Sequence, residues 1–290
     1  MRNKRVWTVV RVIGLLFFLG VLFYPTISDY LSKVNSSHAI SSYEEEVVGM
    51  TEEERQQMLK EARAYNESLK GGTLLEDPFS EESKGSEQYQ KLLAVSLNGL
   101  MGSIRIPRLN IELPIYHTTV ESVLQKGVGH MEGTSIPIGG ESTHAVLTGH
   151  RGIPNSALFT DLDLLQVGDI FYLRVLDQKL AYKVDQIKTV EPHETEDIQI
   201  VPGEDYVTLV TCTPYSVNTH RLLVRGTRID YMEAKQVQPD EVETILYFPD
   251  EVKLLGIATV AIGILLIIVN IWRRRRHGKR QKKRRYRRHT

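Results

Sequence analysis

The chain has 290 residues, 41% of them hydrophobic, with 36 basic and 36 acidic side chains. Hydrophobic residues at this density exclude a mainly disordered protein and predict a folded domain. The charges are segregated, because twelve Lys and Arg lie in residues 273–290 and four in residues 1–24, two segments that contain no acidic residue. Residues 25–272 therefore hold 20 basic and 36 acidic side chains, and this excess of acid argues against nucleic acid as a partner of that part.

Residues 1–26 are predicted to form an N-terminal signal anchor. Three basic residues among the first five precede an apolar stretch, residues 6–24, which only Arg11 interrupts. A small-residue cleavage pattern of the A-x-A kind does not follow it, so retention of the anchor is favoured over its removal. The basic residues place the N-terminus on the cytoplasmic side of the membrane.

Residues 27–100 are predicted to form a helical appendage outside the core. Thr51 is followed three residues later by Glu54, and this pair is typical of a capping box that starts a helix ending near Leu69. Residues 74–86 then have the composition of a mobile loop, and a second helix is expected after this loop, over about 88–97.

Residues 101–230 are predicted to form a closed β-barrel, so the fold class is mainly β. Seven segments are short, rich in β-branched or aromatic residues and separated by turn residues. These segments are residues 103–109, 112–117, 144–150, 169–175, 179–188, 206–213 and 221–228. Two short helices are expected between the strands, near residues 120–126 and 156–165.

Residues 231–253 are interpreted as a tether that returns the chain to the membrane. Residues 254–272 contain nineteen residues without a charge. At about 1.5 Å per helical residue, such a stretch crosses the roughly 30 Å hydrocarbon layer, so a second transmembrane helix is predicted. Basic clusters beside a span stay cytoplasmic, which places the tail, residues 273–290, inside the cell. The alternative is that this tail mainly binds nucleic acid or anionic lipid headgroups.

Cys212 is the only cysteine, so the chain cannot form an internal disulfide. It lies at the end of a predicted strand, and Pro214 ends the strand ladder two residues later. A thiol at a strand end becomes the nucleophile of acyl transfer when a base and an oxyanion donor lie close to it. The alternative interpretation is a small buried hydrophobic residue.

His150 is the best candidate for the base, because it ends another predicted strand and glycines on both sides leave room for its ring. The other candidates are His117, His130, His144 and His220. Each of these is interpreted as a surface or hydrogen-bonded structural histidine.

Three arginines follow Cys212 on the last predicted strand and are candidates for the oxyanion donor. Strand alternation places Arg221 and Arg225 on one face and Arg228 on the other, and the pattern does not separate the first two. A metal site or a cofactor is not predicted, because the sequence lacks the H-E-x-x-H motif, paired cysteines and a phosphate-binding glycine loop.

Three segments resemble the catalytic signatures of sortases. They are LTGHRG at residues 147–152, TLVTC at residues 208–212 and the arginine of NTHRLLVRG at position 221. Longer stretches, GVGHMEGTSIPIGG and LVTCTPYSVNTHRLLVRG, are similar to the pilus-assembling class C sortases of Gram-positive bacteria. The tripeptide Asp77-Pro78-Phe79 and the two membrane segments strengthen that resemblance, which covers roughly residues 27–272.

The resemblance implies a sortase barrel that acts as a cysteine transpeptidase on pilin precursors. Cys212 attacks the Thr–Gly carbonyl of an LPXTG-type sorting signal, His150 acts as acid and base, and Arg221 holds the oxyanion or orients the substrate. A Lys amine of a second pilin then releases the thioacyl-enzyme as an isopeptide. The reaction requires no cofactor, and the catalytic domain lies outside the cell membrane with both termini in the cytoplasm.

The resemblance also implies that residues 74–86 form a lid. Asp77 pairs with Arg221 in this interpretation, Pro78 lies between the two contacts, and the ring of Phe79 packs over the Cys212 thiol. The alternative is an ordinary helix start, with Asp77 as the N-cap and Pro78 as the first helical residue.

Other functions remain open from the sequence. The nearest is a sortase that joins surface proteins to cell-wall peptidoglycan, which differs only in the second nucleophile. A papain-like protease is disfavoured because its histidine follows the cysteine, and an L,D-transpeptidase because its S-x-G-C signature is missing. A membrane-displayed pilus assembly scaffold without activity is the non-enzyme alternative.

Overall fold

The computed structural model describes residues 2–72, 75–79, 85–95, 99–153 and 156–240, together with positions 256 and 263. The chain divides into two compact units, Met1–Thr244 and Ile245–Thr290. Apart from two glycines, the predicted second span, residues 254–272, and the basic tail, residues 273–290, lie outside the described residues, as do residues 241–253 of the predicted tether.

The N-terminal part is a single long helix, α1, from Arg2 to Gly49, with Pro25 inside it. Its segment Ile13–Gly49 is long and apolar enough to cross a membrane, judged by length and composition. Whereas the sequence separates an anchor from a helical appendage, the structure joins the two in one helix. The helix α2, Glu52–Leu69, begins as predicted, because Thr51 accepts a hydrogen bond from the Glu54 backbone and Glu54 caps Thr51 in return.

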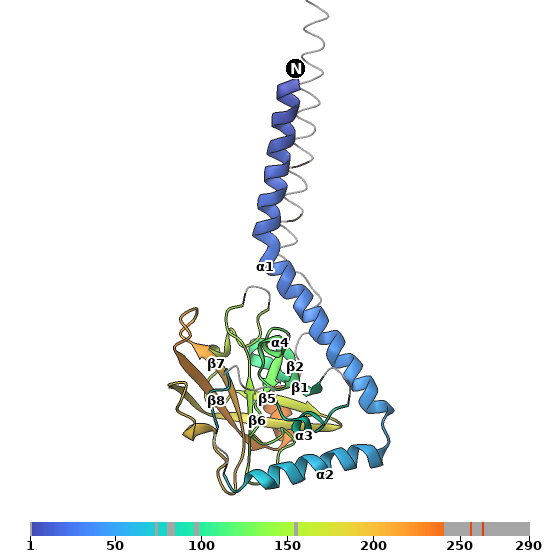
Figure 1. Ribbon diagram of the computed structural model, residues 1–290, viewed down its shortest axis with the longest axis vertical. Coiled ribbons are helices and arrows are strands. Elements are labelled where there is room, and N and C mark those ends of the chain that lie inside the picture. The colour runs from blue at the N-terminus through green and yellow to red at the C-terminus, as the bar shows by residue number, and fades with distance from the viewer. Residues whose placement is uncertain are drawn as a thin grey trace, which may run out of the picture. The chain divides into compact units, whose positions relative to one another are not determined.

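The central part is a closed barrel of eight strands, in agreement with the predicted mainly β fold (Figure 1). The strands are β1 (Leu100–Ile106), β2 (Ile111–His117), β3 (Val128–His130), β4 (Thr143–Thr148), β5 (Ile170–Val175), β6 (Gln178–Val190), β7 (Asp205–Thr213) and β8 (His220–Ile229). Their order around the barrel is β1-β2-β3-β4-β7-β8-β6-β5. The prediction of seven strands misses β3, which has only three residues.

The remaining helices are short. They are α3 (Glu87–Gln90), α4 (Glu121–Leu124), α5 (Tyr231–Val237) and the single 3₁₀ turns η1 (Pro107–Leu109), η2 (Leu162–Leu164) and η3 (Glu196–Ile198). The predicted helix over 156–165 is wrong, because Leu158 has a φ of 38° and Phe159 donates its backbone hydrogen bond to His150 at 3.1 Å. Only the turn η2 remains of it.

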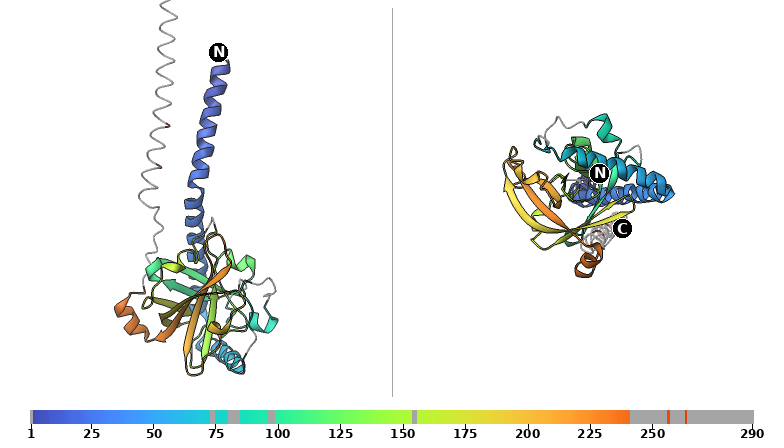
Figure 2. Two further views of the ribbon diagram at one scale, coloured as in Figure 1. Left: turned by 90° about the vertical axis from the view of Figure 1, so that its left-hand side faces the viewer. Right: turned by 90° about the horizontal axis from the view of Figure 1, so that it is seen from below.

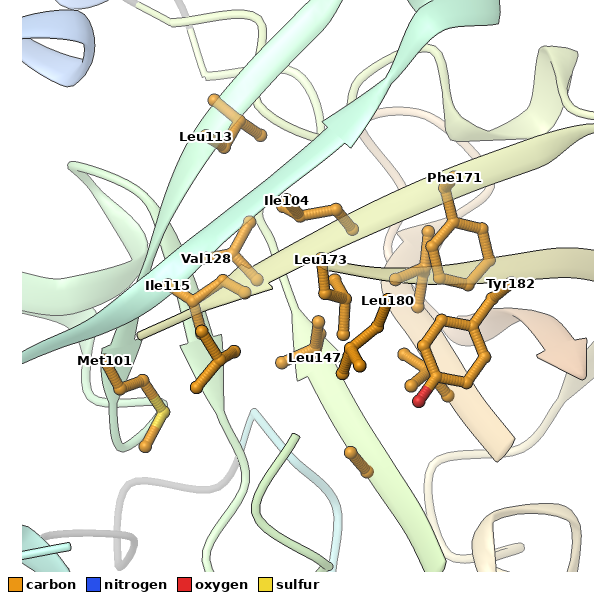
Figure 3. Packing of buried hydrophobic residues seen from close by; sticks show 14 of the residues in the cluster. Met101, Ile104, Leu113, Ile115, Val128, Leu147, Phe171, Leu173, Leu180 and Tyr182 are labelled. Carbon is orange, nitrogen blue, oxygen red and sulfur yellow. The ribbon is translucent and has the colours of Figure 1, made fainter. Parts of the chain in front are cut away.

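Apolar side chains fill the inside of the barrel (Figure 3). Ile104, Leu147 and Leu173 are fully buried there, and the stacked rings of Phe171 and Tyr182 lie 5.7 Å apart. Gly226 faces this ring pair, and a Cβ at that position would lie 2.6 Å from Phe171. The barrel interior therefore leaves no room for a substrate, which has to bind at an end or on the outer face.

The helices α1 and α2 lie on one side of the barrel (Figure 2). Tyr43 of α1 donates a hydrogen bond to the carbonyl of Met101 at 3.0 Å and accepts one from the Leu176 backbone at 2.8 Å. Asn66 of α2 pairs with both backbone groups of Ile136, at 2.7 and 3.1 Å, as a neighbouring strand would. These buried contacts tie the helical part to the barrel as one body.

Candidate active site

The parallel pairing of β4 with β7 brings His150 to the level of Cys212. Thr148 is the register partner of Val210, and the ladder continues because the Gly149 backbone N–H donates to the Val210 carbonyl at 3.0 Å. Thr211 then donates its hydroxyl to the Gly149 carbonyl at 2.7 Å. His150 and Cys212 each follow their matched partner by two residues, so they lie at the same end of adjacent strands.

The antiparallel pairing of β7 with β8 places Arg221 directly opposite Cys212. Side chains of such a pair lie on one face, with their Cβ atoms about 4.5–5.5 Å apart. The three residues predicted from sequence therefore meet at one end of the barrel, which we call the site end. Cys212 and Arg221 are both 9% exposed, so the thiol and the guanidinium are largely shielded from water.

The structure separates Arg221 from the other two arginines. Arg225 forms two hydrogen bonds with Asp185, at 3.1 and 2.7 Å, and its guanidinium lies over the Tyr206 ring. Arg228 lies over the ring of Tyr182, further from the site end along β8. Arg221 is the one of the three that pairs with Cys212, which the alternation pattern does not reveal.

The other candidate histidines have structural surroundings. Both ring nitrogens of His117, His130 and His144 have hydrogen-bond partners, at distances between 2.6 and 2.9 Å. Burial lowers the pKa of His130 to about 3 and that of His144 to about 4, so both are neutral. His220 is part-exposed and hydrogen-bonded to the adjacent Thr219.

Asp77 binds Arg221 with both carboxylate oxygens. The Nε–H donates to Oδ1 at 2.8 Å and an Nη2–H donates to Oδ2 at 2.5 Å, a bidentate pair of the strong kind. The predicted contact between these two residues is thus confirmed. The ring of Phe79 lies 4.9 Å from the Arg221 guanidinium and 5.9 Å from the His150 ring. Its expected contact with the Cys212 thiol stays a prediction.

The segment that carries Asp77 rests on an apolar patch of the outer barrel face. Leu75 and Phe79 pack against it, and its buried members are Met131, Val146, Ile198, Val210 and Leu223. Pro78 and Phe79 form a turn, in which the Phe79 N–H donates to Asp77 Oδ1 at 3.3 Å. An N-cap Asp makes the same bond, and residues 80–84, over which a helix from Asp77 would continue, lie outside the described residues, so the helix start stays an alternative.

The electrostatics of the closed arrangement favour a protonated thiol. Burial raises the pKa of Cys212 above its ordinary value, the Asp77 carboxylate raises it further, and the Arg221 guanidinium lowers it. Although burial lowers the pKa of Arg221, its hydrogen bonds to Asp77 raise it overall. With Asp77 in place, the charge of Arg221 is therefore directed at the carboxylate as well as at the sulfur.

Glu121 is a residue of this site that the sequence does not reveal. Its Oε2 accepts a hydrogen bond from His150 Nε2 at 2.9 Å, and its Oε1 accepts one from Gln125 at 2.9 Å. The bonds from Gln125 and then from His150 lower the pKa of the Glu121 carboxyl. A neutral His150 that donates through Nε2 keeps Nδ1 as its acceptor. Glu121 lies 29 residues before His150 on α4, and such a separation gives no sequence signal.

A metal centre is not formed by the part of the chain that the structure describes, since none of its His, Cys, Asp and Glu residues gather in a group of three or more suited to an ion.

The comparisons with known proteins all find sortases. A family model described as "Sortase domain" matches residues 104–229. Sortase C1 of Streptococcus agalactiae, solved in complex with MTSET, is 49% identical, with a TM-score of 0.62 and coverage of 67% of this chain and 97% of that one. Sortase C-1 from Streptococcus pneumoniae is 48% identical, with a TM-score of 0.63 and coverage of 67% and 99%.

Curated relatives are more distant. Sortase A of Bacillus anthracis is 30% identical over 127 residues, which cover 44% of this chain and 59% of that protein. Sortase A of Streptococcus agalactiae serotype III is 29% identical over 162 residues, which cover 51% and 65%. The chain thus matches less than two thirds of the length of these curated relatives.

Proposed function

Because the chain belongs to the sortase family and closely matches class C sortases in structure, we propose that it is a cysteine transpeptidase that builds covalent pili. It cleaves an LPXTG-type sorting signal of a pilin precursor between Thr and Gly and joins the Thr to a Lys amine of another pilin. The observation that carries this proposal is the meeting of Cys212, His150 and Arg221 at the site end of the barrel.

In the first step, His150 takes the proton of the Cys212 thiol, the sulfur attacks the Thr carbonyl and forms a thioester, and the Gly amine leaves with that proton from His150. Arg221 donates hydrogen bonds to the oxygen that becomes negative. In the second step, the Lys amine attacks the thioester, His150 takes its proton and Cys212 leaves. The thioester conserves the energy of the broken peptide bond, so neither a nucleotide nor another cofactor is required.

The segment with Asp77, Pro78 and Phe79 acts in this proposal as a lid that holds the enzyme inactive. The carboxylate of Asp77 occupies two N–H groups of Arg221, which are then unavailable to an oxyanion. The ring of Phe79 lies beside both His150 and Arg221. A substrate has to displace both side chains before the three groups can act on it.

The proposed location is the cell membrane of a Gram-positive bacterium, with the barrel on the outer side. The apolar part of α1 serves as a retained anchor, and residues 254–272 as a second one. Pilin precursors are held in the same membrane. Restricting enzyme and substrate to one surface raises their effective concentration without any new contact.

The test is cross-linking of candidate pilins by the purified full-length chain in detergent, with the new bond mapped by mass spectrometry. We expect Cys212→Ala and His150→Ala to abolish the cross-link, and Arg221→Ala to lower the rate about 10²–10³-fold, as loss of an oxyanion donor does. Arg225→Ala is the matched control, because Arg225 lies on the same strand and forms an ion pair with Asp185, away from Cys212. Near-normal activity of either of the first two variants would contradict the proposal.

Two alternatives give different outcomes in the same assay. A sortase that anchors surface proteins joins the Thr to an amine of cell-wall peptidoglycan, and mass spectrometry then finds that amine in place of a pilin Lys. An inactive assembly scaffold forms no thioester, so sorting peptides would leave Cys212 free to react with a thiol probe.

A further inference from the structure

The two ends of the barrel are defined by the long strand β6. At its last residue, Val190 pairs with Arg221, which itself pairs with Cys212, so this is the site end. The turn between β5 and β6, which contains Leu176, lies at the beginning of β6. This turn marks the opposite end of the barrel, which we call the far end.

Helix α1 runs between these two ends. Its Tyr43 contacts Met101 and Leu176 at the far end. Its Asp29 accepts a hydrogen bond at 3.0 Å from the backbone N–H of Ala157, which belongs to the loop directly after His150. Ser32 donates its hydroxyl to Ser156 in the same loop at 2.8 Å. The N-terminal half of α1 therefore leaves the domain at the site end, as Figure 1 shows.

The distance from the apolar anchor to this loop is short. The uninterrupted apolar stretch ends at Tyr24, and the five residues from there to Asp29 advance the helix by about 8 Å. The headgroup layer on each side of a bilayer is about 5–8 Å thick. Apolar side chains continue along α1, since Ile27 is 45% and Leu31 is 53% exposed. The loop after His150 accordingly lies at the level of the headgroups when the apolar stretch spans the membrane.

A second loop at the site end presents apolar side chains to solvent. It connects β7 to β8, and in it Tyr215 is 55% and Val217 is 63% exposed. Gly152, with a φ of 75°, passes so close to the Tyr215 ring that a Cβ there would lie 2.8 Å from it. This contact links the β7–β8 loop to the loop that touches α1.

The composition of the β7–β8 loop fits a lipid surface. Residues 214–219 carry no charge, although the chain between the two basic ends is strongly acidic and is repelled by anionic headgroups. Tyrosine is favoured at the membrane interface because its ring is apolar and its hydroxyl is polar. An uncharged tip with Tyr215 and Val217 is therefore the part of the site end best suited to enter the headgroup layer.

We propose that the site end of the barrel rests on the outer membrane surface, with Tyr215 and Val217 of the β7–β8 loop in the headgroup layer. The inference rests on the membrane anchoring proposed above and adds to it the orientation of the domain. Cys212, near the site end of β7, then lies close to the bilayer, at the height where a membrane-held precursor presents the chain next to its own anchor.

The test places a fluorescent NBD probe on single cysteines of the full-length chain in nanodiscs of phosphatidylglycerol that contain a nitroxide-headgroup lipid. In a Cys212→Ala background, the probe is attached to Val217→Cys and, as a second site, to Tyr215→Cys. Val201→Cys is the matched control, because it is an exposed valine in the loop that precedes β7, at the far end. The nine residues of β7 keep these loops about 30 Å apart.

We expect the nitroxide lipid to cause a loss of NBD emission at positions 217 and 215 and no loss at position 201. Equal emission at all three positions, or a loss confined to 201, would overturn the proposal, as would failure of the chain to enter the nanodiscs. Because the assay contains no substrate, its outcome does not depend on whether the enzyme joins pilins, and the cross-linking assay reports on that separately.

Discussion

The side chains around Cys212 set the state of its sulfur. Burial and the nearby Asp77 carboxylate raise the pKa of the thiol, and Arg221 opposes them. Reactivity of a cysteine depends on its thiolate fraction. The pairing of Asp77 with Arg221 thus lowers the thiolate fraction of Cys212, since the guanidinium that stabilises a thiolate is shared with a carboxylate.

Replacement of Asp77 by Asn should therefore activate the thiol. The variant keeps the size of the side chain and removes the charge that raises the Cys212 pKa, so the pKa falls and more thiolate is present at neutral pH. We expect the pH midpoint of alkylation by iodoacetamide to move to lower pH and the rate at pH 7 to increase. Glu76→Gln is the matched control, an exposed neighbour. An unchanged midpoint in Asp77→Asn would refute this assignment.

Glu121 is expected to act by orienting His150. Glu121→Ala removes the 2.9 Å bond to Nε2 and should lower kcat for sorting-peptide cleavage about tenfold, the effect of about 1.4 kcal/mol, with KM unchanged. Glu121→Gln keeps an acceptor oxygen and should restore part of the rate. Ser122→Ala, an exposed position on the same helix, is the control. A rise in KM without a change in kcat would show that Glu121 binds substrate instead.

At the scale of whole elements, the local sequence predicts the strands that are long enough to show a pattern of residue types. Seven of the eight strands are predicted within three residues of their bounds. The short β3 is missed because three residues cannot show alternation, and Val128–His130 are held extended by β2 and β4 on either side. Cys212, His150 and three arginines are visible as candidates. Strand alternation does not separate Arg221 from Arg225, the resemblance to sortases selects Arg221, and the β7–β8 register that places it opposite Cys212 is contained in no local pattern.

The docking of α2 is a contact between elements that the sequence does not predict. Asn66→Ala leaves the buried N–H and C=O of Ile136 without their partner, and each such group costs about 1–3 kcal/mol. We expect a loss of about 2–4 kcal/mol in the free energy of unfolding, measured by urea titration. Gln57→Ala on the exposed face of α2 should change it by less than about 0.5 kcal/mol. An equal change in the free energy of unfolding for both variants would mean that the docking of α2 does not depend on the pairing of Asn66 with Ile136.

At the scale of the molecule, the chain has two basic ends and an acidic middle, and this segregation determines its expected topology. The tail, residues 273–290, holds twelve basic residues and no acidic one. Insertion of a single Arg or Lys at the centre of a membrane costs about 2.5–3.5 kcal/mol, so translocation of the tail is strongly opposed. Together with the basic N-terminus, this predicts that the two ends lie on the cytoplasmic side.

A protease added to intact protoplasts should therefore spare residues 273–290, as detected by an antibody against the tail. The same protease should remove the tail after the protoplasts are permeabilised, which is the control for accessibility of the cleavage sites. Loss of the tail while the membrane is still sealed would contradict the predicted topology.

The closed arrangement around Asp77 also bears on oxidative damage. Cys212 is the only cysteine, so the chain offers no second thiol to trap a sulfenic acid as a disulfide before it is oxidised irreversibly. Peroxide reacts with the thiolate, and the same burial and carboxylate that raise the Cys212 pKa keep the sulfur protonated. In the proposed enzyme, the one nucleophile is thereby preserved until a substrate binds, and its working lifetime depends on how rarely Asp77 releases Arg221.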